Sequence, residues 1–384
     1  MRVFFYAIFF HLTLSLYVFY KAWHALSGRK AGRIALASIF IVEFIVYLVG
    51  LLLHRHIPYA TVRMVWMMGT SWMLFMLYMS MGLLIFDIFR AIDKRKPFLT
   101  KPLREYGKKV QMAIFSAVLV IVVLILWRGN YKFNHPAIVH NDVHIEKSAG
   151  TIDSIRIALI GDTHFGYLIH KPYAKKYVDL IMAQKPDLIL FVGDIIDSEI
   201  EPILHEQMGE ETRRLHAPFG VYTCTGNHEY RYETEEKIKW LNNNGITVLR
   251  DTAILVNQAF YIVGREDLEA PFTRKATKEI IQQENIDRSK PIIVLSHNPR
   301  SIREEADAEV DMALYGHTHR GQFFPANLVT DVLFEVSHGH KKIGNTYVHV
   351  TSGLGLSGPQ YRVGSQSEIV MLNVRFQPTR TNYK

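Results

Sequence analysis

The chain has 384 residues, a formal net charge of +8 and a single cysteine, Cys224, which excludes an internal disulfide. Residues 1–130 hold 16 Lys and Arg against 4 Asp and Glu, whereas the remaining residues hold 28 against 32. Because the basic excess accompanies apolar segments, it indicates membrane orientation, and no nucleic-acid partner is expected.

Four apolar stretches in the first third of the chain are long enough to cross a bilayer, which takes about 20 residues each. They lie near residues 3–20, 34–53, 65–86 and 110–127. The first is not expected to be a cleaved signal peptide, because its apolar run is long and three more follow. The sequence therefore predicts a four-helix transmembrane region over residues 1–130, a multi-pass membrane protein, and the lipid bilayer as a partner.

The basic residues between these stretches predict their direction. Residues 21–33 contain four Lys or Arg and residues 87–109 contain eight, whereas the loop between the second and third stretches offers little beyond Arg55 and Arg63. Basic loops face the cytoplasm. Both termini, and the region after residue 130, are then expected outside the cytoplasm.

Two ionisable residues, His11 and Glu43, fall within the predicted spans. Such residues are candidates for function by default. A pair buried inside the helix bundle is the favoured interpretation, because no second acidic residue accompanies Glu43 within the spans.

The rest of the chain alternates strand-like and helical segments. Residues 130–150 resemble a polar tether with weak strand character, and strands are expected at residues 155–160, 188–192 and 221–225, with helices at 173–183, 202–215 and 235–243. Such alternation predicts right-handed crossovers and a parallel sheet. Later strands, at residues 253–264, 291–296, 312–315, 347–351 and 368–375, have a single helix between them and predict a second sheet.

Five short polar segments each follow one of the apolar strands. They read Gly-Asp-Thr-His, Gly-Asp-Ile-Ile-Asp, Gly-Asn-His-Glu, Ser-His-Asn-Pro and Gly-His-Thr-His, and begin at residues 161, 193, 226, 296 and 316. Binding sites in such sheets form beyond the carboxyl ends of the strands. Carboxylate, imidazole and amide donors converging there suit two metal ions that share a bridging carboxylate.

This ordered set of segments resembles the calcineurin-like metallophosphoesterase superfamily. The later stretch Ser-Gly-Leu-Gly-Leu-Ser-Gly-Pro at residues 352–359, followed by Gln-Tyr-Arg, resembles the bacterial membrane-associated branch. The match covers roughly residues 138–376. Together with the expected second sheet, it implies an α/β domain over residues 131–384 in which two β-sheets are sandwiched between helices, a four-layer αββα arrangement.

The resemblance also implies the roles of individual residues. One metal ion would take Asp162, His164, Asp194 and His319, and the second would take Asp194, Asn227, His297 and His317, with Asp194 bridging. His228 would stabilise the transition state and protonate the leaving group. The expected cofactors are two divalent ions, Mn²⁺ first, with Fe, Zn²⁺ or Mg²⁺ as alternatives.

Four further residues have weaker assignments. Asp197 and Glu229 are expected to orient ligand histidines through their free ring nitrogens, with a turn or helix-cap role as the alternative. Arg320 could bind a phosphate or acidic headgroup, or point into solvent. Arg362 is a second candidate for contact with a substrate phosphate.

Together these features predict a membrane-bound phosphoesterase with two metal ions. It would hydrolyse a phosphomonoester, phosphodiester or pyrophosphate bond of an envelope or lipid-linked substrate, through attack by a metal-activated hydroxide. Two alternatives remain open: a nucleotide-sugar–lipid pyrophosphatase on the cytoplasmic face, and a transmembrane transport or partner-binding module regulated by the metal domain. The last is disfavoured because the spans lack the paired charges and interrupted helices of transporters.

Overall fold

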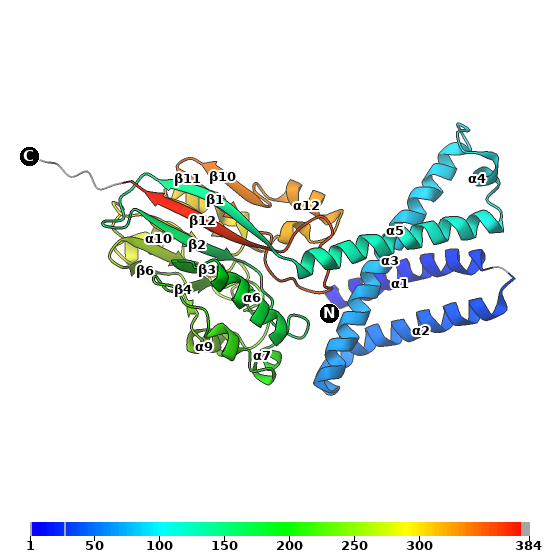
Figure 1. Cartoon of the computed structure of the whole chain (residues 1–384), viewed down its shortest axis with the longest axis horizontal. Helices are drawn as coiled ribbons and strands as arrows, with labels where there is room; N and C mark the ends of the chain where they lie inside the picture. The colour runs from blue at the N-terminus through cyan, green and yellow to red at the C-terminus, as the bar shows by residue number, and fades with distance from the viewer. Residues whose placement is uncertain (1, 27, 378–384) are drawn as a thin grey trace, which may run out of the picture. The chain divides into compact units, whose positions relative to one another are not determined.

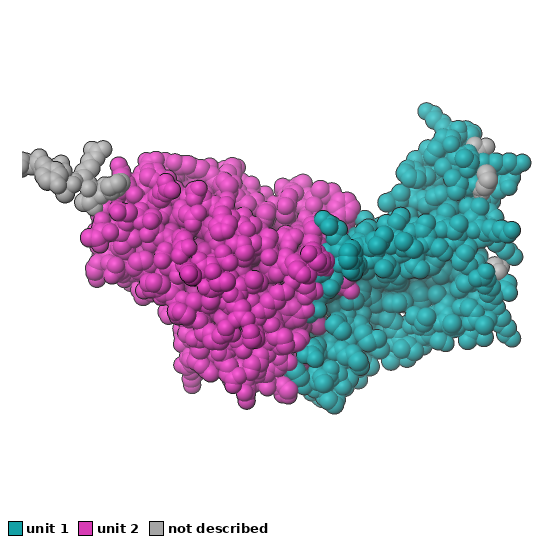
Figure 2. All heavy atoms as spheres, viewed as in Figure 1, with its two compact units in different colours: residues 1–130, 358–360 teal, residues 131–357, 361–384 magenta. Residues whose placement is uncertain are grey.

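The computed structural model describes the backbone of residues 2–26 and 28–377, and the side chains in those ranges except at positions 2–7, 51, 54, 102 and 104. The chain divides into two compact units (Figure 2). The helical unit comprises residues 1–130 and 358–360, and the sheet unit comprises residues 131–357 and 361–384. The division falls at the predicted boundary, except that the short segment 358–360 groups with the helices.

Long helices make up the described part of the helical unit (Figure 1). They are α1 (Arg2–Ala25), α2 (Lys30–Leu53), α3 (Tyr59–Asp93) and α5 (Lys108–Asn134), with the short η1 (His54–His56) and α4 (Lys101–Glu105) between them. Among the described residues, three segments are long and apolar enough to cross a membrane: Lys30–Gly50, Tyr59–Asp93 and Lys108–Asn134. The chain is therefore a membrane protein, while the fourth span, at residues 3–20 in α1, stays a prediction.

Glycines allow α3 to approach its neighbours closely. A Cβ atom on Gly69 would lie 3.3 Å from the Cα atom of Tyr47 in α2, and one on Gly82 would lie 2.7 Å from Cγ1 of Val118 in α5. Small residues at such crossings let helices pack in a bilayer, where apolar burial alone gives little drive for association.

The two ionisable residues of the spans lie together. His11 Nε2 is 3.3 Å from Glu43 Oε2, and both side chains are buried. The His11 ring also stacks on Tyr47, with 4.2 Å between the ring centroids. The structure therefore shows the pair inside the bundle that the sequence favoured.

The sheet unit contains two six-stranded sheets. The first has the order β1-β12-β2-β3-β4-β5 and the second has the order β10-β11-β9-β8-β7-β6. In the first sheet β12 runs antiparallel to β2, and the remaining pairs are parallel. The strands of the first sheet are β1 (Ala137–Ile145), β2 (Ser154–Ile160), β3 (Leu188–Val192), β4 (Val221–Cys224), β5 (Thr247–Val248) and β12 (Glu368–Phe376).

In the second sheet, β6 pairs antiparallel with β7 and β10 pairs antiparallel with β11, whereas the central strands are parallel. Its strands are β6 (Thr252–Val256), β7 (Phe260–Gly264), β8 (Ile292–Leu295), β9 (Met312–Tyr315), β10 (Gly339–Ile343) and β11 (Thr346–Val350). The helices of this unit are α6 (Lys171–Ala183), α7 (Glu201–His205), α8 (Gly209–Thr212), α9 (Thr234–Asn243), α10 (Thr277–Gln283), α11 (Ile302–Asp307) and α12 (Ala326–Leu333).

Alternate side chains of the central strands enter different apolar layers. In β3, Leu190 belongs to the core between the two sheets, together with Leu295 and Leu314 of the second sheet. Its neighbour Phe191 faces the opposite way, into the cluster that α6 covers. A third cluster joins the outer face of the second sheet to α10 and α11. These layers give the predicted αββα arrangement, because strand side chains alternate with a period of two.

Several segment boundaries differ from the prediction. The expected tether at residues 130–150 is instead the end of α5 followed by β1, an edge strand whose polar side chains alternate on its exposed face. The expected helix at residues 202–215 is broken into α7 and α8, with Gln207 between them in the left-handed region at φ 53°. The expected strand at residues 253–264 is a hairpin of β6 and β7 that turns at Asn257 and Gln258. The later strands alternate with three helices, whereas one helix was expected.

Candidate metal centre

The predicted metal ligands all lie on loops that follow the carboxyl ends of strands. The loops after β2, β3 and β4 come from the first sheet, and the loops after β8 and β9 come from the second. The ligands they carry are Asp162, His164, Asp194, Asn227, His297, His317 and His319. Because the strands within each set are parallel, their ends share one edge of their sheet, and the structure brings the two edges together.

The backbone of these loops is unusual. Five of the seven residues adopt the left-handed region, with φ of 54° at Asp162, 48° at His164, 51° at Asp194, 69° at His317 and 47° at His319. Residues other than glycine rarely adopt this conformation, and it gathers at functional sites where the surrounding structure enforces it. Glycine makes the close approach possible, since a Cβ atom on Gly226 would lie 2.2 Å from Oδ1 of Asp194.

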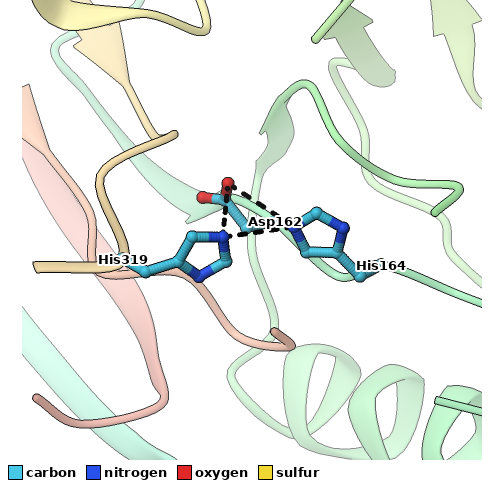
Figure 3. A group of neighbouring side chains, drawn as sticks. All are labelled: Asp162, His164 and His319. Atoms are coloured by element: carbon cyan, nitrogen blue, oxygen red, sulfur yellow. Dashed lines mark hydrogen bonds and ion pairs between the residues drawn. The ribbon is translucent and has the colours of Figure 1, made fainter. Parts of the chain in front are cut away.

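The first cluster consists of Asp162, His164 and His319, whose ligand atoms point toward one another (Figure 3). The Nε2 atoms of the two histidines lie 3.2 Å apart. Oδ1 of Asp162 lies 3.4 Å from Nε2 of His319 and 4.0 Å from Nε2 of His164. Asp194 borders this cluster, with Oδ2 3.7 Å from Nε2 of His164.

The second cluster lies on the other side of Asp194. Its Oδ2 atom is 3.2 Å from Nε2 of His297. Oδ1 of Asn227 is 3.1 Å from Nε2 of His297 and 3.1 Å from Nδ1 of His317. Asp194 therefore contacts ligands of both clusters with one oxygen, which is the position expected of a bridging carboxylate.

The donor set fits divalent cations on chemical grounds. Nδ1 of His297 lies 2.7 Å from the carbonyl oxygen of Val192, so this nitrogen carries a proton and donates it. Nε2 then faces the oxygens of Asp194 and Asn227, at 3.2 Å and 3.1 Å. Lone pairs that converge at this distance repel each other unless a proton or a cation lies between them. Imidazole, carboxylate and amide ligands without thiolate suit Mn²⁺, Fe, Zn²⁺ or Mg²⁺.

Electrostatics separate the histidines into two kinds. Burial lowers the pKa of His317 to about 3, with the charge of His297 as the next contribution, and burial and Arg362 hold the pKa of His319 well below its usual range. Burial also opposes charge on His297, but Asp194 and Asp162 outweigh it and raise its pKa well above the usual value. His317 and His319 are thus neutral and ready to bind metal, whereas His297 holds a proton that a metal ion would displace.

His228 projects into the same site from the loop after β4. Its Nδ1 atom lies 2.6 Å from Oδ1 of Asp197, and its Nε2 atom lies 3.9 Å from Oδ2 of Asp194. Asp197 also lies 3.4 Å from Nδ1 of His164. Burial opposes the charge on Asp197, yet hydrogen bonds from His164 and His228 lower its pKa below the usual range. Asp197 therefore orients two histidines, as predicted for this residue.

Glu229 has the turn role that the sequence left open as an alternative. Its carboxylate accepts hydrogen bonds from four backbone N–H groups, those of Asp194 (2.9 Å), Ile195 (2.9 Å), Ile196 (3.1 Å) and Gly226 (2.7 Å). Glu229 is buried and holds the loop after β3 against the loop after β4. It contacts the backbone of the ligand loops, which favours the turn role over contact with a histidine ring.

The expectation for Arg362 is corrected. Its side chain is fully buried and donates to the backbone carbonyls of His319 (3.2 Å), Ser352 (2.7 Å) and Gly353 (3.1 Å), and to that of Gly355. Burial lowers its pKa to about 10. The guanidinium therefore fixes the turn that carries His319 instead of contacting a substrate phosphate. Arg320, in contrast, is exposed, with its backbone N–H bonded to Thr318 Oγ1.

Two buried charged residues near the centre were missed by the sequence reasoning. Asp267, beyond the end of β7, is 2 % exposed, and its backbone N–H donates to Oγ1 of Thr225, two residues before Asn227. Burial raises its pKa, and the nearby His297 opposes that shift. Lys237 on α9 donates to the carbonyl oxygen of His228 at 2.7 Å. Asp267 follows an apolar strand, as the ligands do, and that signal could have identified it.

Comparison with known proteins agrees with this geometry. Residues 155–321 match the sequence model of the calcineurin-like phosphoesterase family. A metallophosphoesterase of Helicobacter pylori (strain J99) is 30% identical over 258 residues, which are 65% of this chain and 66% of that protein. One from Aquifex aeolicus is 29% identical over 225 residues, covering 58% of this chain and 85% of that protein.

A transmembrane protein with metallophosphoesterase domain from Danio rerio is 26% identical over 268 residues, 66% of this chain and 60% of that protein. The chain thus spans just under two thirds of the length of the Helicobacter and Danio relatives. The matched residues 155–321 contain all seven predicted ligands together with His228. The family match and the relatives thus identify residues 155–321 as a calcineurin-like phosphoesterase domain.

Proposed function

We propose that the protein is a membrane-bound, metal-dependent hydrolase that cleaves a phosphomonoester, phosphodiester or pyrophosphate bond of an envelope or lipid-linked substrate. The observation that carries the proposal is the convergence of acceptor atoms on both sides of Asp194. When bound at these two clusters, divalent cations supply an activated water nucleophile and neutralise the charge of phosphate oxygens. We propose Mn²⁺ first among the ions that suit this donor set.

The residues of the chain supply positioning and proton transfer. Asp197 fixes the His228 ring through Nδ1, which leaves Nε2 directed toward the space beside Asp194. From there Nε2 can hydrogen-bond a phosphoryl oxygen or donate a proton to the departing oxygen. Such general acid assistance typically contributes about 10²–10⁴-fold to the rate. Arg320, exposed beside His319, is proposed to contact an anionic part of the substrate.

The proposed substrate class rests on the helical unit. Its membrane-spanning helices keep the sheet unit near a bilayer, where lipid-linked phosphates are concentrated. The basic loops at residues 21–33 and 87–109 support an extracytoplasmic location for the metal centre. A reporter fused to the C-terminus tests this orientation: alkaline phosphatase activity is expected, and cytoplasmic fluorescence of a fused green fluorescent protein would reverse it.

The activity is tested by hydrolysis of bis(4-nitrophenyl) phosphate with added Mn²⁺. We expect turnover by the full chain and a loss of about 10³-fold in Asp194→Asn, because a metal centre supplies several kcal/mol of transition-state stabilisation. The matched control is His216→Ala, which removes an exposed imidazole whose Nδ1 contacts the backbone carbonyl of Arg214, and should leave the rate unchanged. Equal rates in all three proteins would contradict the proposal.

A further inference from the structure

Helix α12 carries its apolar side chains on its outer face. Leu328, Val329, Val332 and Leu333 are exposed by 53%, 54%, 86% and 63%. Positions i, i+1, i+4 and i+5 lie on one side of a helix, so these four residues form a continuous stripe, which we call the α12 patch. No residue of α12 (Ala326–Leu333), all of which the structure describes, is buried.

The start of α12 packs closely on the rest of the sheet unit through its backbone. A Cβ atom on Gly321 would lie 2.3 Å from the backbone nitrogen of Asn327. Thr330 Oγ1 donates within the helix to the carbonyl oxygen of Asn327 at 2.9 Å, and the exposed Asp331 accepts a hydrogen bond from Ser337. A helix on a water-soluble domain normally buries its apolar stripe and exposes its polar side. The exposed apolar stripe of α12 is the kind of surface that contacts a membrane or a binding partner.

The helix is linked, within the sheet unit, to the point where the chain arrives from the membrane. Phe323, just before α12, bridges to Val363 and Gly364. Gln366 then donates from Nε2 to the carbonyl oxygens of Lys132 (3.0 Å) and His135 (2.9 Å), at the end of α5. The segment 363–366 thus connects the start of α12 with the last turn of α5.

That last turn is fixed in the sheet unit and lies close to the apolar part of α5. Phe133 is fully buried in the cluster that α6 covers, and Asn134 accepts a hydrogen bond from Tyr173 at 3.2 Å. The apolar run of α5 ends near Trp127, about six residues before Phe133. At 1.5 Å per helical residue, this places Phe133 roughly 9 Å along the axis from the end of the apolar run.

We propose that the α12 patch inserts into the headgroup region of the bilayer that α5 crosses. An amphipathic helix of this kind lies in the plane of the interface with its apolar face in the boundary between headgroups and acyl chains. Because Gly321 of the His319–Gly321 turn packs directly on α12, docking would set the metal centre beside the lipid surface. The docking itself does not depend on the proposed hydrolase activity.

The test uses the full chain in nanodiscs of phosphatidylcholine and phosphatidylglycerol. A cysteine at Val332→Cys is labelled with an environment-sensitive nitrobenzoxadiazole dye, and the matched control is Asn345→Cys in the exposed turn between β10 and β11. The native Cys224 is buried, and burial raises the pKa of its thiol well above the usual value, so it should stay unlabelled. Mn²⁺ binding by each labelled protein establishes that it is folded.

We expect the dye at residue 332 to emit at shorter wavelength and to lose roughly half its intensity when brominated lipid replaces ordinary lipid. The dye at residue 345 should respond to iodide in the water and not to brominated lipid. Equal quenching of both dyes by iodide would overturn the proposal. Protection of residue 332 from both quenchers would also overturn it, because protein would then cover the patch. Leu328→Cys gives a second position with the same expected outcomes.

Discussion

The two units of the chain use apolar residues in opposite ways. In the sheet unit, apolar side chains fill the layers on both faces of each sheet, and the polar ligands sit buried at the strand ends. In the helical unit, large apolar side chains such as Ile41 (60% exposed) and Val120 (57% exposed) point outward. A lipid-facing surface requires only that residues be apolar, whereas the metal centre requires particular atoms at particular positions. Substitutions should therefore have very unequal effects in the two units.

The α12 patch departs from the pattern of the rest of the sheet unit. The patch belongs to the sheet unit. Its residues Val332 and Leu333 are more exposed than most of the exposed large apolar side chains of the helical unit. This outward apolar pattern is what the proposed docking of α12 into the headgroup region would explain.

The largest effect on stability is expected at Glu229. Replacement by Ala leaves four buried backbone N–H groups without their acceptor. Since each unsatisfied buried donor costs about 1–3 kcal/mol, the free energy of unfolding should fall by at least about 3 kcal/mol. Thermal unfolding in detergent measures this, with the exposed Glu236→Ala as the matched control on α9. Similar melting temperatures for the two variants would show that Glu229 does not hold the ligand loops.

The next largest effect concerns catalysis by His228. The variant His228→Ala should lose about 10²–10⁴-fold in kcat, because it lacks the proton donor beside Asp194, while Mn²⁺ binding should change little. Asp197→Asn should lose less, about 10–100-fold, because the rings of His228 and His164 remain but are less well oriented. Steady-state kinetics together with metal titration separate these effects. If His228→Ala abolished Mn²⁺ binding instead, the histidine would be a ligand.

The affinity for metal should depend on pH with a defined sign. The pKa of His297 is raised well above its usual value, so the metal-free site holds a proton there at neutral pH. Metal must displace this proton, and affinity should rise as pH increases, by about tenfold per unit for one displaced proton. Calorimetry in buffers of different ionisation enthalpy should detect the release. A constant affinity between about pH 6 and 8 would contradict the proton on His297.

The smallest effect is expected on the surface of the helical unit. Ile41→Leu keeps an exposed apolar position apolar, so stability should change by less than about 0.5 kcal/mol and activity should not change. The variant to compare with it is Ile41→Asp, which should impair insertion into the membrane. A charge in the hydrocarbon region costs about 2.5–3.5 kcal/mol on insertion scales. Equal membrane yields of the Leu and Asp variants would show that this position does not face lipid.

The convergence of the candidate metal ligands was predictable because they follow apolar strands in a fixed order. Asp162 and His317 are separated by more than 150 positions, yet the backbone N–H of His317 lies 3.1 Å from Oδ1 of Asp162. A parallel sheet makes such convergence predictable, because strand order and direction fix where the loops meet. The layers of the sheet unit were predictable for the same reason.

The sequence could not settle the roles of residues that depend on which way a side chain points. Glu229 follows a histidine in the sequence, but its carboxylate turns toward the backbone of two loops. Arg362 was a candidate for contact with a substrate phosphate, whereas its guanidinium is enclosed by backbone carbonyls. Likewise, the periodicity of α12 indicates an apolar face but does not say that this face points outward. These orientations arise from tertiary packing, which local sequence patterns do not encode.

The most direct test of the account is elemental analysis of the purified, active full chain alongside Asp194→Asn. The account predicts about two divalent ions per chain in the wild type, and a marked loss of bound metal and of phosphodiesterase activity in the variant, because Asp194 contacts both clusters. Active wild-type protein without bound divalent metal, or a variant that keeps its full metal content and rate, would contradict it.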